Sequence, residues 1–274
     1  MANPTSQPPA VLPKKGSIFC HWFCVFLLAI VASWEVVSFF CPLGFQGTLD
    51  AAFISLATIG TLVALWRQLP LQNIVVAALA IAVIGGGLSA LGVRTALPFG
   101  PFIYGAPFGP QIFKTLPWAM PLLWVVIVLN SRGVARMILR PWRKNKKYGF
   151  RAIALAGILV LLFDVALEPF ATLVKHYWRW VPTAIPVTWE GAALVNFLSW
   201  GFIAVLMLLF VTPVLISKKP RPKSGPDYHP LCLWLGGLII FATGCTVHGF
   251  WLPVIVDAAI GIVTAIFAIR GAMW

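Results

Sequence analysis

The chain has 274 residues, of which 60% are apolar and only 10% are charged. This composition excludes an ordinary soluble domain, which has no use for so many uninterrupted apolar runs, and it is typical of an all-α, polytopic membrane protein. The net charge of +13 does not indicate nucleic-acid binding, because the basic residues stand between the apolar runs, where they set topology and contact anionic headgroups.

In chain order, the polar and proline-rich residues 1–15 are expected to form a disordered tail, and residues 16–274 a single transmembrane helical domain. About eight helices are expected, at residues 18–40, 49–66, 71–93, 115–130, 151–175, 191–216, 231–247 and 250–269. A seven-helix arrangement is the alternative, in which the last two segments form one broken hairpin. The stretch Cys20-His21-x-x-Cys24 resembles half of a metal site, but no second pair follows it, so no metal is expected.

The basic residues orient the bundle. With eight spans and a cytoplasmic N-terminus, sixteen lysines and arginines fall on the cytoplasmic side and only Arg94, Lys114, Lys175 and Arg179 on the outer side. Cytoplasmic loops carry such an excess, so both termini of an inner-membrane protein are expected in the cytoplasm.

In this orientation six of the seven acids gather near the outer side: Glu35, Asp50, Asp164, Glu168, Glu190 and Asp257. A charge inside the bilayer costs at least ~2.5 kcal/mol on insertion scales, so such residues are expected to face a cavity or a partner. Polar chemistry is therefore expected in the outer half of the protein.

Two outer connections are rich in aromatic residues, proline and glycine. Residues 96–110, ALPFGPFIYGAPFGP, are too broken for a helix and too apolar for a free loop, so we expect a re-entrant or interfacial lid packed on the bundle. Residues 176–191, HYWRWVPTAIPVTWEG, add three tryptophans. An aromatic belt at the headgroups is the alternative, but rings this dense beside intramembrane acids favour a hydrophobic pocket.

The stretch LLFDVALEPF places Asp164 and Glu168 four residues apart, on one face of a helix that Pro169 ends or kinks. The proline is expected to free the carbonyl of Val165 beside the two acids. Apolar burial favours a neutral carboxyl, and two close acids do not comfortably both ionise, so the pair favours a shared proton with one acid and one base. The alternative is structural: each acid satisfies a neighbouring helix or pairs with an outer arginine.

Several motifs carry a resemblance to a known family: PFGPFIY at 98–104, GP at 109–110, LPWAMPLLW at 116–124, DVALEP at 164–169, W-x-W at 178–180 and GAALVNFLSW at 191–200. In order and spacing they resemble the CruF-type membrane carotenoid-biosynthesis proteins, the carotenoid 1′,2′-hydratases and bisanhydrobacterioruberin hydratases. The resemblance covers roughly residues 85–205. It implies a cofactor-independent enzyme that adds water to the terminal double bond of an acyclic carotenoid, either lycopene-like or a C50 precursor. A glycosyltransferase would often modify the resulting tertiary alcohol.

The chain departs from the family pattern at several positions. Ser89, Ala96 and Phe102 stand where family members usually have an acid, a glycine and a tyrosine. The usual Tyr-Gly-x-Pro is replaced by residues 190–193, EGAA, so the chain resembles a divergent member. Glu190 or Glu35 could stand in for the missing acid.

Hydration of an isoprenoid alkene needs a neutral acid, aromatic faces around a tertiary cation, and an acceptor that activates water. We expect Asp164 to donate the proton and Glu168 to orient the water, although the two roles could be exchanged. The expected substrate-binding residues are Pro98, Phe99, Tyr104, Trp178, Trp180, Asn196 and Trp200, and the possible supporting acids are Glu35, Glu190 and Asp257. Aromatic faces would stabilise the cation, and an amide would hold water or a carboxyl.

Other function classes fit the sequence less well. A non-catalytic membrane protein that binds a carotenoid or lipid would use the same pocket but would not need the two acids together. A transporter predicts internal repeats and polar residues in both halves of the membrane. The expected partners are therefore the carotenoid and membrane lipids, and not nucleic acid.

Overall fold

The computed structural model describes residues 15–41, 46–182, 188–216 and 225–274. The expected N-terminal tail lies outside these residues except for Lys15. The described residues form the elements α1 (Lys15–Phe40), α2 (Gln46–Trp66), α3 (Leu71–Thr95), β1 (Phe102–Tyr104), η1 (Ala106–Phe108), β2 (Gln111–Ile112), β3 (Leu116–Pro117), α4 (Ala119–Ile138), η2 (Arg140–Trp142), α5 (Tyr148–Pro169), η3 (Phe170–Val174, a π-helix), β4 (Trp178–Trp180), β5 (Thr188–Trp189), β6 (Ala192–Ala193), α6 (Leu194–Val211), α7 (His229–Val247) and α8 (Trp251–Ala272).

Eight of the described helices are long and apolar enough to cross a membrane, which confirms the expected helical bundle. The last two spans are separate helices joined at residues 248–250, so the broken-hairpin alternative is wrong. The protein is an integral membrane protein.

The fourth span differs from its expected position at 115–130, since α4 runs from Ala119 to Ile138. The polar residues near position 130, where the span was expected to end, form hydrogen bonds with neighbouring parts of the bundle. Asn130 donates to Thr61 Oγ1 at 2.9 Å, Trp234 donates to Ser131 Oγ at 3.1 Å, and Arg132 donates to the carbonyl of Leu215 at 3.1 Å. Buried polar groups with partners do not end a helix.

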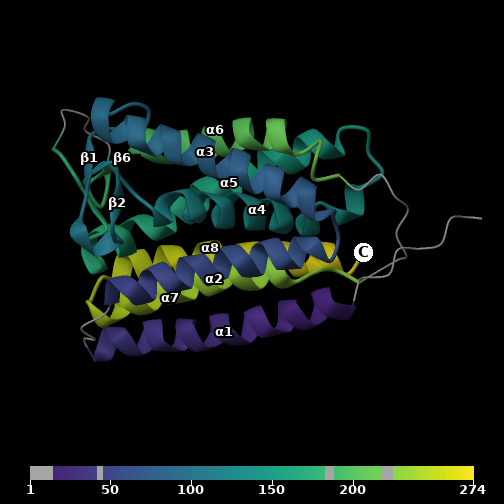
Figure 1. The fold of residues 1–274 in the computed structure, drawn as a ribbon, viewed down its shortest axis with the longest axis horizontal. Coiled ribbons are helices and arrows are strands. Elements are labelled where there is room, and N and C mark those ends of the chain that lie inside the picture. The colour runs from purple at the N-terminus through teal and green to yellow at the C-terminus, as the bar shows by residue number, and fades with distance from the viewer. Residues whose placement is uncertain (1–14, 42–45, 183–187, 217–224) are drawn as a thin grey trace, which may run out of the picture.

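Helix α4 is central and contacts α2, α3, α5, α7 and α8. Helices α3, α4, α5 and α6 form one half of the bundle, α2, α7 and α8 form the other, and α1 lies outermost against α2 (Figure 1). Strands β1, β2 and β6 lie at one end of the bundle, which we call the loop end, and the C-terminus lies at the opposite, terminal end (Figure 1).

Helices α5 and α6 approach closely because glycines face each other. A Cβ on Gly157 would lie 2.4 Å from Val205 Cγ2, and a Cβ on Gly201 would lie 3.1 Å from the Gly157 carbonyl oxygen. Small residues at such a crossing let two membrane helices pack backbone to backbone. The site described next is built on the loop ends of these two helices.

Candidate active site

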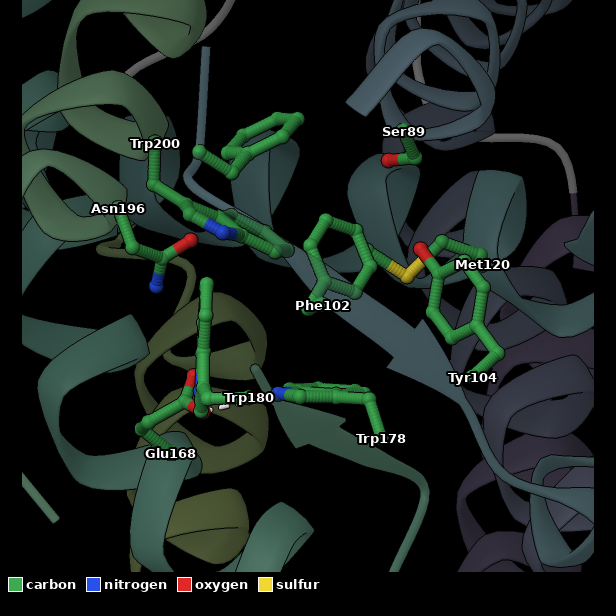
Figure 2. A pocket seen from close by; sticks show the side chains of 10 residues that line it. Ser89, Phe102, Tyr104, Met120, Glu168, Trp178, Trp180, Asn196 and Trp200 are labelled. Carbon is green, nitrogen blue, oxygen red and sulfur yellow. Dashed lines mark hydrogen bonds between the residues drawn. The ribbon is translucent and has the colours of Figure 1, made fainter. Parts of the chain in front are cut away.

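A small pocket lies at the loop end of the bundle, and its open space of about 20 Å³ is room for roughly one water molecule. It is formed by α3, β1, α4, α5, β4 and α6 together with the segment that follows α3 (Figure 2). Its lining is mostly aromatic and consists of Ser89, Phe99, Phe102, Tyr104, Met120, Glu168, Trp178, Trp180, Asn196 and Trp200. Such an apolar hollow with a few convergent polar groups is the usual form of a small-molecule site.

Glu168 is the carboxyl in this lining, and one of its oxygens is held by two tryptophans. Trp178 Nε1 donates to Glu168 Oε1 at 2.8 Å, and Trp180 Nε1 donates to the same oxygen. The other oxygen, Oε2, has no hydrogen-bond partner among the described residues, and the residue is only 1% exposed. Oε2 is therefore free to bind a group that enters the pocket.

Asp164 lies one turn deeper on α5 and is completely buried. Asn196 Nδ2 donates to Asp164 Oδ2 at 2.8 Å, while Oδ1 has no partner in the described chain. Asn196 lines the pocket and Asp164 does not. Asp164 is thus connected to the pocket through Asn196.

Pro169 allows the end of α5 to take a further partner. Because its nitrogen carries no proton, it cannot donate to the carbonyl of Val165. The indole of Trp189 donates to that carbonyl at 3.0 Å instead. Trp189, which lies shortly before α6, is therefore packed against the last turns of α5.

The short antiparallel ribbon of β1 and β4 brings the rings together. Phe102 pairs with Trp180 and Tyr104 pairs with Trp178, so residues two apart on each strand share one face. Ile103, between the two inward rings of β1, is 45% exposed. The ribbon therefore places four rings on the pocket and closes the end of the bundle.

Tyr104 is a buried hydroxyl in this ring cluster, with no hydrogen-bond partner among the described residues. Burial raises the pKa of this hydroxyl well above its usual value, and this effect outweighs the opposing effect of the neighbouring Ser89 hydroxyl. The group is therefore a phenol, not a phenolate, over the whole ordinary pH range.

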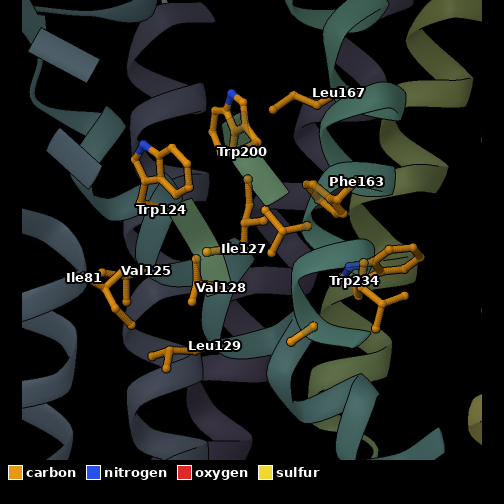
Figure 3. Close-up of a cluster of buried hydrophobic side chains, with 14 of the residues drawn as sticks. Ile81, Trp124, Val125, Ile127, Val128, Leu129, Phe163, Leu167, Trp200 and Trp234 are labelled. Carbon is orange, nitrogen blue, oxygen red and sulfur yellow. The ribbon is translucent and has the colours of Figure 1, made fainter. Parts of the chain in front are cut away.

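The floor of the pocket is Trp200, which stacks on Trp124 behind it. The ring centres of Trp124 and Trp200 (Figure 3) lie 3.8 Å apart with 14° between their planes. Trp124 Nε1 donates to Ser89 Oγ at 3.0 Å. A Cβ on Gly85 would lie 2.4 Å from Trp124 Cγ, so only glycine leaves room for this ring. The floor closes the pocket toward the middle of the bundle.

The remaining expected residues lie outside the lining. Pro98 is half-buried, and its carbonyl accepts a hydrogen bond from Ser199 at 2.8 Å. Glu35 forms an ion pair with Lys175, and neither Glu190 nor Asp257 lines the pocket. Asp257 is buried on α8 with no partner for either oxygen among the described residues.

Neither Arg94 nor Arg179 forms an ion pair with the two acids among the described residues, whereas Asp164 does bond to a neighbouring helix, through Asn196 of α6. Arg94 donates to Thr115, and Arg179 points outward from β4. The described residues include no group of three or more His, Cys, Asp or Glu that could hold a metal ion.

Three lining residues were not expected as site residues: Ser89, Phe102 and Met120. Phe102 could have been predicted, because it lies two residues before Tyr104 and side chains two apart on a strand share one face. Ser89 was noted only as a departure from the family pattern, and nothing in the sequence singles out Met120.

A family model described as "Carotenoid biosynthesis protein" matches residues 49–264. The chain belongs to this family of carotenoid biosynthesis proteins. It is similar to the bisanhydrobacterioruberin hydratase of Haloarcula japonica, with 27% identity over 180 residues that cover 64% of this chain and 57% of that protein. No solved structure matches the chain.

Proposed function

We propose that the protein is a carotenoid hydratase, which adds water to the terminal 1′,2′ double bond of an acyclic carotenoid and yields a tertiary alcohol. The observation that carries the proposal is the state of Glu168, with one oxygen held by two indole N–H groups and the other without a partner in an aromatic pocket. Such a carboxyl can release a proton and tolerate the charge left behind. The family and the name of the Haloarcula japonica relative support this class of reaction.

The reaction proceeds through a carbocation. Glu168 gives its proton to C2′, and positive charge develops on the tertiary carbon C1′. The faces of Phe102, Trp178 and Trp200 stabilise this cation by about 0.5–2 kcal/mol per well-placed ring. Water then bonds to C1′ through its oxygen and returns one proton to Glu168, so the product gains one water and the enzyme is unchanged.

Asp164 acts through Asn196 in this scheme. Because Asn196 uses its NH₂ group to donate to Asp164, its carbonyl oxygen is available to accept a hydrogen bond from the attacking water. Glu168, which lines the pocket, therefore transfers the proton. This revises the expected roles, in which Asp164 was the donor and Glu168 oriented the water.

The size of the pocket limits what it holds. Its open space of about 20 Å³ is far below the range of about 300–1,000 Å³ for ligand pockets, so the surrounding rings must move apart when a substrate binds. In this proposal only the end of an isoprenoid chain enters between the rings, and the polyene extends out of the bundle. We place the loop end at the extracytoplasmic side, because the basic residues predict cytoplasmic termini.

Expression of the chain in a lycopene-producing host tests the proposal. We expect pigments heavier by one water, absent in Glu168→Gln and reduced in Asp164→Asn. Asp227→Asn, a similar change near the terminal end, should leave the product unchanged. Unaltered lycopene that co-purifies with the wild-type chain would favour the carotenoid-binding alternative, and full hydration by Glu168→Gln would refute the assigned site.

A further inference from the structure

A buried charge cluster lies beside the active site without lining its pocket. Lys175 follows the π-helix at the end of α5. Its Nζ forms one ion pair with Glu35 of α1 and another with Asp50 of α2, where Nζ lies 2.8 Å from Oδ1. Nζ also lies 5.2 Å from the ring centre of Phe39 and 5.9 Å from that of Phe170. All three charged side chains are at most 8% exposed.

Lys175 occupies the point where the chain reverses between Glu168 and its two indole donors. Trp178 follows Glu168 by only ten residues, so the chain must turn back to reach its side chain. The turn is made by bonds from Lys175 N to Phe170 O at 2.9 Å and from Tyr177 N to Ala171 O at 2.8 Å. The lysine side chain ties this same turn to α1 and α2.

Neither α1 nor α2 contributes a residue to the pocket lining. Helix α2 packs on α3 and α4, and the charge cluster adds a direct link from α1 and α2 to the turn that precedes β4. Buried ion pairs are weak evidence for a gain in stability, because desolvation offsets much of the attraction. What they can supply is a defined geometry, since two carboxylates from different helices leave one ammonium group few positions.

We propose that Glu35, Asp50 and Lys175 form an anchor that positions Trp178 and Trp180 on Glu168. Lys175 is a positioning residue, because it touches neither Glu168 nor the pocket and acts through the turn that carries the two indoles. The catalytic consequence rests on the proposed hydratase function, whereas the placement of the indoles can be measured without it.

The proposal is tested by ¹⁹F NMR of the full chain labelled with 5-fluorotryptophan in detergent micelles. Signals of Trp178 and Trp180 are assigned with the two single phenylalanine variants. We expect Lys175→Met to shift or broaden both signals and Lys175→Arg to restore them. Arg67→Met, which removes the Arg67–Asp227 pair near the terminal end, is the matched control and should move neither signal.

Lys175→Met leaves two buried carboxylates unpaired and is prone to misfold. A second variant, Glu35→Gln/Asp50→Asn/Lys175→Met, removes all three charges with little change in shape. We expect it to fold and still to show displaced indole signals. Unchanged signals in this folded variant would overturn the anchor.

Kinetics supply the second readout. Loss of positioning should lower kcat about tenfold or more with a smaller effect on KM, since misplacement by about 1 Å can cost 10²-fold in rate. An activity loss that only follows the folded fraction, without rescue by Lys175→Arg, would indicate a purely structural cluster. If the wild type lacks hydratase activity while the NMR result holds, the proposed function fails and the anchor stands.

Discussion

The two indole donors on Glu168 give the sharpest test of the proposed chemistry. Trp178→Phe and Trp180→Phe keep an aromatic face in the pocket but remove the N–H that each indole donates to Glu168 Oε1. The carboxylate forms as the alkene is protonated, so these bonds strengthen in the transition state.

The expected loss of kcat follows from the strength of a hydrogen bond to a charged carboxylate. A hydrogen bond to a charged group contributes about 1.5–3 kcal/mol, and about 1.4 kcal/mol corresponds to a tenfold change in rate. Each substitution should therefore lower kcat about 10- to 100-fold. Because both donors share one oxygen, the double variant should lose less than the product of the single effects.

The assay is the rate of hydrated product formed by purified protein in lipid nanodiscs supplied with lycopene. Trp234→Phe is the control, because it removes another buried indole donor, bonded to Ser131 in the core at 3.1 Å. We expect that variant to retain kcat within a few-fold after correction for folded fraction. Wild-type kcat in both Trp178→Phe and Trp180→Phe would refute the idea that the indoles stabilise the carboxylate.

Further predictions concern the floor, the tyrosines and the amide. Gly85→Ala should displace the Trp124–Trp200 stack and lower the free energy of unfolding by about 1–3 kcal/mol, as overpacking does. Gly87→Ala is the control, because its Cβ would meet nothing within 4 Å, and it should be neutral or stabilising. Thermal unfolding of the two variants distinguishes them. Burial raises the pKa values of Tyr104 and Tyr177. Their contribution to stability is therefore present below about pH 10, where an unfolded tyrosine ionises, and is lost as the pH rises through the folded values. The fall in Tm above that pH should therefore be smaller in Tyr104→Phe/Tyr177→Phe, and an equal fall would contradict the shifts. Asn196→Ala should lower the free energy of unfolding by about 1–3 kcal/mol, because it leaves Asp164 without its hydrogen-bond donor. Chemical denaturation should show a smaller loss for the same substitution in a protein that already carries Asp164→Ala.

The sequence was sufficient for the helices because each span is a long apolar run. It failed at α4, where Asn130 and Arg132 have the polarity of a helix end but find partners across the bundle. Hydropathy along a chain carries no information about such cross-helix bonds.

The site was predictable in part. Spacing placed Asp164 and Glu168 on one face, but which of them lines the pocket depends on how α5 is rotated in the bundle. The tryptophans of β4 were expected as ring faces, and their role as donors to Glu168 depends on the chain reversal after Pro169. The ion pair between Lys175 and Asp50 joins residues 125 positions apart, a distance at which no local pattern indicates contact.

The number of residues between Glu168 and β4 determines which side chains of the strand face the carboxyl group. Because successive side chains of β4 point to opposite faces, deletion of a single residue from the turn would swap Arg179 into the place of an indole and turn the rings outward. Evolution can therefore exchange residues within this turn far more easily than it can change their number, which gives a way to recognise the same site in relatives of very different sequence.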